Sequence, residues 1–244
     1  MAKEFKVPSR KQPIWKPIRK VFEFFGWRNI KVELLTDKIE EKSIIVSNHS
    51  AKKGPMGCEI ALPVFNVKWG AHEMLGNYRS RWNYLVNVFY TQKQKMKPLK
   101  AKFKATFEAI FSKRIYTGMK FIGTYPDGRL KITIRNSIKV LEDNKAILVF
   151  PEDSNDGYFD VMTSFFPGFV MLSEQYYKLH GEDLPVYPMY YHHKSKRLIV
   201  DKPLYIQELI KQGMNRKEIA EHFCNLVNNL YFKYIENKYY KFIN

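Results

Sequence analysis

The stretch SIIVSNHSAKKGP, residues 43–55, joins a strand-like apolar run to a polar segment and then to a glycine–proline step. The run 44–46 indicates a buried strand, and Pro55 suits the first position of a helix. A strand that leads through a loop into a helix is the repeating unit of α/β folds. Ligands of such folds bind at the carboxyl ends of strands, so His49 occupies the place where chemistry is expected.

Strands and helices alternate along the rest of the chain. Apolar runs bounded by turn residues predict strands over 30–35, 43–47, 66–71, 120–125, 146–150, 185–191 and 197–201. Helical periodicity predicts helices over 55–62, 134–143, 166–180 and 215–240, with a broken helical region over 76–116. This alternation predicts the α/β class: a single domain with a largely parallel sheet flanked by helices.

The N-terminal 27 residues differ from this pattern. Residues 1–13 form a basic lead-in, and residues 14–27 combine aromatic and aliphatic side chains at helical spacing with interleaved Lys and Arg. Such a segment forms either an amphipathic helix docked on the core or an anchor lying in a membrane interface. We therefore expect an N-terminal element, 1–27, followed by an α/β domain, 28–244.

Composition narrows the possible partners. Lys and Arg outnumber Asp and Glu by 41 to 24, giving +17, which favours a nucleic acid, an anionic membrane or a phosphorylated substrate. The six lysines of residues 93–104 form either a solvated helix face or a surface that meets phosphate groups. Cys58 and Cys224 do not make a disulfide scaffold and are expected to be reduced core residues of a cytosolic protein.

A second informative loop is LVFPEDSNDGYFD, residues 148–160. An apolar strand again ends in a polar loop, which Pro151 stiffens and in which Glu152 follows at once. Carboxylates at short spacing suit Mg²⁺ or Ca²⁺, but the loop lacks the spacing and the terminal Glu of an EF-hand. We therefore expect no metal here.

Together these blocks resemble the lysophospholipid acyltransferase family, of the 1-acylglycerol-3-phosphate acyltransferase type. Asn48 and His49 match the family's Asn-His motif, and KWGAHEM (68–74) and the strand with Pro188 are similar to two further blocks. The family's Phe-Pro-Glu-Gly-Thr-Arg loop reads here Phe150, Pro151, Glu152, Asp153, Ser154 and Asn155. The blocks follow the family order over residues 28–203.

Two departures from the family pattern concern charge. Gly54 stands where the family has the aspartate that supports the histidine. We expect Glu59, about one turn into the following helix, to take that role; the alternative is a solvent-facing glutamate. Asn155 stands where the family has an arginine, so the acceptor phosphate needs other cations, for which Arg129, Lys52 and Lys53 are the candidates.

The resemblance implies direct acyl transfer at a membrane surface. His49 would act as general base, and a hydroxyl of a lysophospholipid or glycerolipid would attack the thioester of an acyl-CoA or acyl-carrier protein, with no cofactor and no acyl-enzyme. The implied catalytic residues are His49 and Glu59, and the implied substrate-binding residues are Asn48, Lys52, Lys53, Arg129, Pro151, Glu152, Ser154 and Asn155. The protein would be cytoplasmic and peripheral on the inner face of an anionic membrane.

Two other functions remain open. The missing aspartate suits an inactive acyltransferase fold that binds lipid. The charge of +17 and sixteen tyrosines suit phosphate tracking and base stacking on nucleic acid. The sequence contains no recognised nucleic-acid motif, however, so no nucleic-acid partner is expected.

Overall fold

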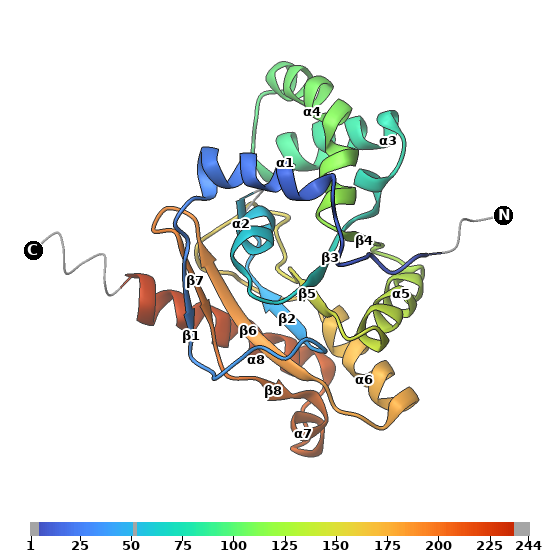
Figure 1. Ribbon diagram of the computed structural model, residues 1–244, viewed down its shortest axis with the longest axis vertical. Coiled ribbons are helices and arrows are strands. Elements are labelled where there is room, and N and C mark those ends of the chain that lie inside the picture. The colour runs from blue at the N-terminus through green and yellow to red at the C-terminus, as the bar shows by residue number, and fades with distance from the viewer. Residues whose placement is uncertain (1–4, 51–52, 237–244) are drawn as a thin grey trace, which may run out of the picture.

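One mixed, mostly parallel sheet organises the protein. The computed structural model describes residues 5–50 and 53–236, so Lys52 lies outside the described residues. The described strands are β1 (Lys31–Leu34), β2 (Ile44–Ser47), β3 (Asn66–Ala71), β4 (Phe121–Thr124), β5 (Ala146–Val149), β6 (Pro185–His192), β7 (Arg197–Val200) and β8 (Leu204–Tyr205). Their order is β1-β7-β6-β2-β5-β3-β4, with β8 beside β6, and only the pairs β6·β7 and β6·β8 are antiparallel among those described (Figure 1). The predicted α/β class with a largely parallel sheet is confirmed.

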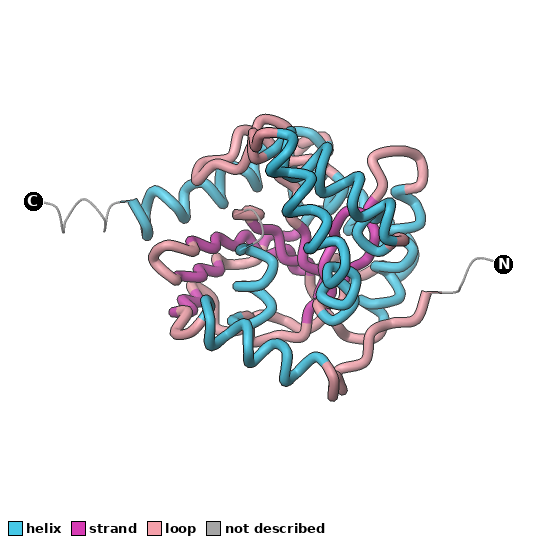
Figure 2. The backbone as a smooth tube through the Cα atoms, turned by 90° about the horizontal axis from the view of Figure 1, so that it is seen from above, coloured by secondary structure: helices cyan, strands magenta, loops and turns pink. Residues whose placement is uncertain are grey.

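Helices cover both faces of this sheet (Figure 2). The described helices are α1 (Trp15–Phe22), α2 (Lys53–Ala61), α3 (Tyr78–Asn83), α4 (Pro98–Gly118), α5 (Leu130–Glu142), α6 (Gly168–His180), α7 (Ile206–Lys211) and α8 (Arg216–Tyr231). Among the described residues, η2 (His72–Leu75) is a 3₁₀ helix. The segments η1 (Glu23–Trp27), η3 (Tyr84–Lys93) and η4 (Phe232–Glu236) are π-helical. No helix of the described residues is long and apolar enough to cross a bilayer.

Alternate residues of the central strands point into two separate cores. Ile44 and Ile147 pack in one core with side chains of α5, α6 and α8, whereas Ile45 and Leu148 pack in the other with Cys58 of α2. Because both faces are covered, β2 and β5 are buried along their whole length, which explains their continuous apolar runs. Because β2 and β5 pair directly and in parallel, their carboxyl ends, where the motifs lie, are side by side.

Local sequence signals explain several helix ends. Pro98 occupies the first turn of α4, Asn215 and Glu218 form a capping box at the start of α8, and Gly181 ends α6 with a φ of 68°. The sequence pattern did not predict β8 and α7, because two and six residues are too few to show a period. Helix α5 begins at Leu130, four residues before the predicted start.

Helix α1 has one docked face and one exposed face. Trp15 is 5 % exposed and packs with Met56 and Met119; a Cβ at Gly118 would lie 2.2 Å from the Trp15 ring, so α1 closely approaches the end of α4. The expectation of a docked helix is confirmed for this face. On the outer face, Ile18 and Val21 of α1 are exposed, and so is Phe25 of η1, which a fully docked segment 14–27 would bury.

Candidate active site

His49 lies just beyond the carboxyl end of β2, and Asn48 fixes that end. The Asn48 side-chain oxygen accepts a hydrogen bond from the Tyr191 N–H (2.8 Å), and its amide donates to the Tyr191 carbonyl (3.0 Å). Asn48 is 2 % exposed. Both the acceptor and the donor of the Asn48 side-chain amide therefore bond to the backbone of Tyr191 and extend the pairing of β2 with β6. Asn48, expected to bind substrate, has a structural role in this arrangement.

Gly54 allows the turn from His49 into α2. A Cβ at residue 54 would lie 2.1 Å from the His49 carbonyl oxygen, far inside van der Waals contact. The backbone therefore excludes any larger residue here, including the aspartate that the resemblance places at this position. The close approach of residue 54 to the His49 carbonyl thus gives a steric reason for glycine, rather than aspartate, at this position.

Glu152 connects the β5 loop to His49. Its carboxylate accepts a hydrogen bond from the His49 backbone N–H at 2.6 Å, and it is 7 % exposed. Burial raises the pKa of Glu152 to about 7, although the His49 hydrogen bond and the charge of Lys93 partly oppose this. Glu152 thus positions the histidine through the backbone, and the two motif loops predicted from sequence do meet.

The rest of this loop is held by a residue that the sequence did not suggest. Lys93, at the end of η3, donates a hydrogen bond to the Ser154 hydroxyl (2.6 Å) and lies 5.6 Å from the Tyr158 ring centre. Burial lowers the pKa of Lys93, against the opposing charges of Glu152 and Asp153. Asn155 accepts a hydrogen bond from Gln92 of the same helical segment (3.4 Å), and Pro151 is buried. Lys93 is one member of the lysine-rich run, but no local pattern distinguishes it.

The His49 ring borders an apolar cavity of about 280 Å³. The ring stacks on Tyr158 and meets Phe150 edge-on, both at 5.1 Å between ring centres. Aliphatic and aromatic side chains form most of the cavity wall, among them Phe22, Trp27, Met56, Phe89, Ile115 and Tyr116. The cavity therefore offers a histidine beside a space that suits a hydrocarbon chain.

A few polar groups enter this cavity. Glu108 of α4 lines it and accepts a hydrogen bond from the Tyr90 hydroxyl. Burial raises the pKa of Tyr84 to about 12 and that of Tyr158 well above its ordinary value, so both phenols stay protonated. Glu108 is the acidic residue in the wall of the His49 cavity, and sequence reasoning missed it because α4 lies far from both motifs in the chain.

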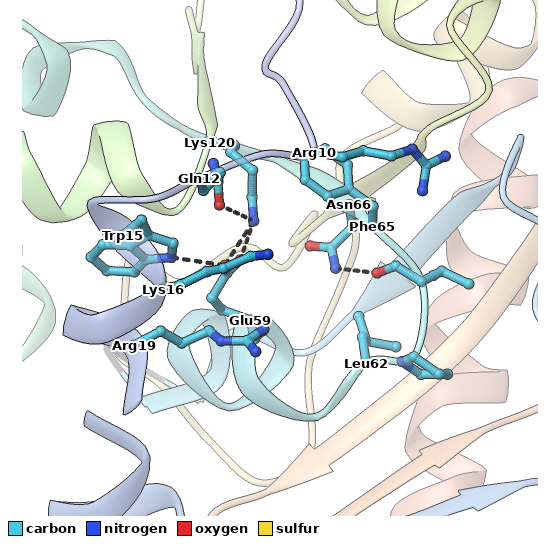
Figure 3. Close-up of a pocket in the computed structure, with 12 residues that line it drawn as sticks. Arg10, Gln12, Trp15, Lys16, Arg19, Glu59, Leu62, Phe65, Asn66 and Lys120 are labelled. Carbon is cyan, nitrogen blue, oxygen red and sulfur yellow. Dashed lines mark hydrogen bonds and ion pairs between the residues drawn. The ribbon is translucent and has the colours of Figure 1, made fainter. Parts of the chain in front are cut away.

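Glu59 lies in a different environment from the expected one. Its carboxylate accepts hydrogen bonds from Trp15 Nε1 (2.9 Å) and, through both oxygens, from Lys120 (2.7 and 2.9 Å) (Figure 3). It also accepts one from Lys68 (2.5 Å). Lys68 is fully buried. The expectation that Glu59 supports the His49 ring is wrong, because its carboxylate is directed into this ion cluster and all four interactions go to other residues.

The ion cluster of Glu59, Lys68 and Lys120 stabilises the contact between several elements of the fold. Burial by itself would raise the pKa of Glu59, but Lys68 and Lys120 lower it below its ordinary value, so the carboxylate is charged. Burial and the neighbouring Lys68 lower the pKa of Lys120 to about 8. Glu59 therefore holds together α2, β3, the start of β4 and, through the Trp15 indole, α1.

The remaining candidate residues are spread out. Arg129 is exposed at the start of α5, paired with Asp127 at 2.7 Å. It follows β4, three strands from β2 in the sheet order, or about 14 Å at normal strand spacing. Lys53 is exposed at the first turn of α2. The structure therefore does not bring Arg129 to His49, and it does not describe Lys52.

Comparison with known proteins gives no match for this chain, either among protein-family models or among curated proteins. Within residues 5–50 and 53–236, no group of three or more His, Cys, Asp and Glu could hold a metal ion. The function is therefore inferred from the geometry around His49.

The buried Glu152 leads to a prediction on stability. A raised pKa means that the folded protein binds a proton more tightly than the unfolded chain, so folding stability falls as pH rises from about 4.5 to about 7. Glu152→Gln keeps an oxygen for the His49 N–H and removes the titration. We expect the variant to gain about 3 kcal/mol relative to wild type between pH 4.5 and pH 7.5. Urea unfolding at several pH values measures this difference, and a difference that stays constant with pH would contradict the raised pKa of Glu152.

Proposed function

We propose that the protein is an O-acyltransferase that moves a fatty acyl group from an acyl thioester to a hydroxyl of a lysophospholipid or related glycerolipid. The observation that carries this proposal is the position of the His49 imidazole at the wall of an apolar cavity, at the carboxyl edge of the sheet. The cavity would take the acyl chain, and each CH₂ buried there would contribute about 0.8 kcal/mol to binding.

The chemistry needs one base and no covalent intermediate. His49 would take the proton of the acceptor hydroxyl while the oxygen attacks the thioester carbonyl carbon. Collapse of the tetrahedral intermediate would break the C–S bond, and the imidazolium would return its proton to the leaving thiolate. Glu152 would act as a positioning residue, since its contact is with the His49 backbone.

Turnover with defined substrates tests the proposal. Purified full-length protein is incubated with radiolabelled acyl-CoA, or with acyl-carrier protein, and a panel of lysolipids, and ester formation is followed together with release of the free thiol. We expect ester and thiol in equal amounts with at least one acceptor. Thiol release without ester would indicate thioester hydrolysis and contradict the proposal.

A lipid-binding protein without catalysis is the second candidate. The observation that favours it is Gly54, whose backbone contact with His49 excludes the family's aspartate. Tight binding of acyl-CoA without turnover, unchanged in His49→Ala, would favour this function over transfer.

We also propose that α1 contacts an anionic membrane on the cytoplasmic side. The outer face of the segment made of the N-cap Ile14, α1 and η1 carries apolar side chains at helical spacing, namely Ile14, Ile18, Val21 and Phe25, all exposed. Arg19 and Lys20 lie in the last turn of α1. An amphipathic helix of this composition suits the lipid interface.

Removing one of these side chains should weaken membrane binding. Phe25 is 80 % exposed, so Phe25→Ser should leave the fold unchanged. Part of the 1.5–3 kcal/mol of a buried phenylalanine is gained at an interface, and a loss of about 1 kcal/mol lowers affinity about fivefold. Co-sedimentation with anionic vesicles measures the change, and affinity equal to that of wild type would argue against membrane contact through the α1–η1 segment. Deleting residues 1–27 is a poorer test, because it removes Trp15 from the ion cluster.

A further inference from the structure

Helix α4 presents a row of large apolar side chains to solvent. Five of them are between 53 and 83 % exposed: Leu99, Phe103, Phe107, Ile110 and Phe111. Their spacing of three and four residues places them on one side of the helix. Phe103 and Phe107 stack edge-on at 5.1 Å between ring centres. A contiguous apolar surface of this kind normally marks an interaction site.

The opposite side of the same helix is already used by the core. Ala101, Ala105 and Ala109 are fully buried and pack with Leu85 and Phe89 of η3. The small side chains allow α4 to lie close to η3, so the packing cannot be reversed to bury the large residues without losing this contact. The packing of the alanine side of α4 against η3 therefore leaves the large apolar side chains of the opposite side in solvent.

The exposed charges around this row of apolar side chains are positive, which favours an anionic partner. Six cations of α4 and its N-cap are exposed: Lys97, Lys100, Lys102, Lys104, Lys113 and Arg114. The acidic residue of the helix, Glu108, lines the inner cavity instead. Phenylalanine and leucine flanked by lysines match an anionic lipid interface, where the rings enter the acyl boundary and the ammonium groups meet phosphates.

Helix α4 also lies near α1. The two helices occupy the same end of the molecule (Figure 1), and Trp15 at the start of α1 packs against Gly118 at the end of α4. The cavity beside His49 has Phe22 and Trp27 of the α1–η1 segment in one wall and Ser112 and Ile115 of α4 in another. The two segments that carry the exposed apolar surfaces thus each contribute side chains to the wall of one cavity.

We propose that the outer face of α4 is a second membrane-binding surface, which takes up the interface of an anionic phospholipid bilayer. With α1, it would hold the His49 cavity against the lipid surface. Membrane binding by α4 does not depend on catalysis; only the delivery of a lipid acceptor to His49 rests on the proposed acyltransferase function.

A single environment-sensitive dye tests this surface directly. Cys58 and Cys224 are buried, and burial raises their pKa values to about 12 and about 11, so neither thiol competes for the label at neutral pH. Phe103→Cys in the full chain is labelled with a nitrobenzoxadiazole dye and mixed with phosphatidylglycerol vesicles. Leu179→Cys, at an exposed apolar position on α6, is the matched control.

We expect a blue shift and a rise in emission for the label at residue 103 and no change at residue 179. The shift should weaken as salt rises, because charges are screened over about 10 Å at 0.1 M. The unlabelled double variant Phe103→Ser/Phe107→Ser should lose at least tenfold in vesicle affinity, while Leu179→Ser keeps it and all melting curves stay the same. No shift with vesicles would overturn the proposal.

Other occupants of the row give different results, each of which would overturn the proposal. A shift that grows with protein concentration without vesicles would indicate self-association. A shift with an acidic acyl-carrier protein but not with vesicles would indicate a protein partner.

Turnover with a short-chain, water-soluble lysolipid in the absence of vesicles separates the two proposals. If this turnover is absent while the dye shift is normal, the acyltransferase function is rejected and the membrane-binding surface on α4 is retained.

Discussion

His49→Ala should lower the rate of acyl transfer by about 10² to 10⁴, the range for a lost general base. The substitution removes the imidazole but keeps the backbone N–H that donates to Glu152, so the connection between the two loops remains. We therefore expect a fall in kcat with little change in melting temperature. Steady-state kinetics with a water-soluble acceptor measures the effect without membrane binding.

A second histidine provides the control. His180 lies in the last turn of α6 and pairs with Glu142 at 3.1 Å, so His180→Ala should leave turnover unchanged. If His49→Ala folds and turns over at a near-normal rate, His49 is not the base and the proposed mechanism is wrong.

Glu59→Gln should destabilise the protein by about 3–5 kcal/mol, the cost of breaking a buried ion pair. The change leaves the buried ammonium groups of Lys68 and Lys120 facing a neutral amide, which accepts fewer hydrogen bonds than the carboxylate. Urea unfolding followed by circular dichroism measures the loss.

The pattern of effects separates a structural glutamate from a catalytic one. Glu73→Gln, which removes a surface pair with His72, should cost less than about 1 kcal/mol. The triple variant Glu59→Leu/Lys68→Met/Lys120→Met should recover much of the stability, because apolar side chains of similar size replace all the charges. A Glu59→Gln protein of normal stability with a tenfold lower rate would show instead that Glu59 serves His49.

The sequence predicted the features that local patterns encode. The apolar runs of β2 and β5 are continuous because both faces of the central strands are covered. Since parallel strands end at one edge of a sheet, the motifs after them could be expected to meet, and Glu152 does contact His49. Predictions based on the strand ends therefore placed both loops.

Features that depend on packing between distant segments were not predictable. The partners of Glu59 come from α1, β3 and the residue before β4, and no local pattern connects them. In α4, the lysines were apparent in the sequence, but the exposure of Phe103 and Phe107 follows only from the burial of the alanine face. The clash that a Cβ at residue 54 would make with the His49 carbonyl oxygen likewise could not be predicted from a local sequence pattern.

The most direct test of the central claim is product analysis in one reaction. Full-length protein is mixed with acyl-CoA labelled in the acyl chain and with anionic vesicles that contain a lysophospholipid, and the lipids are separated and identified by mass. The proposed function predicts a labelled diacyl lipid, free CoA in equal amount, and loss of both products in His49→Ala. Labelled acyl-CoA that stays intact and bound to the protein, with no ester formed on any acceptor of the panel, would contradict it.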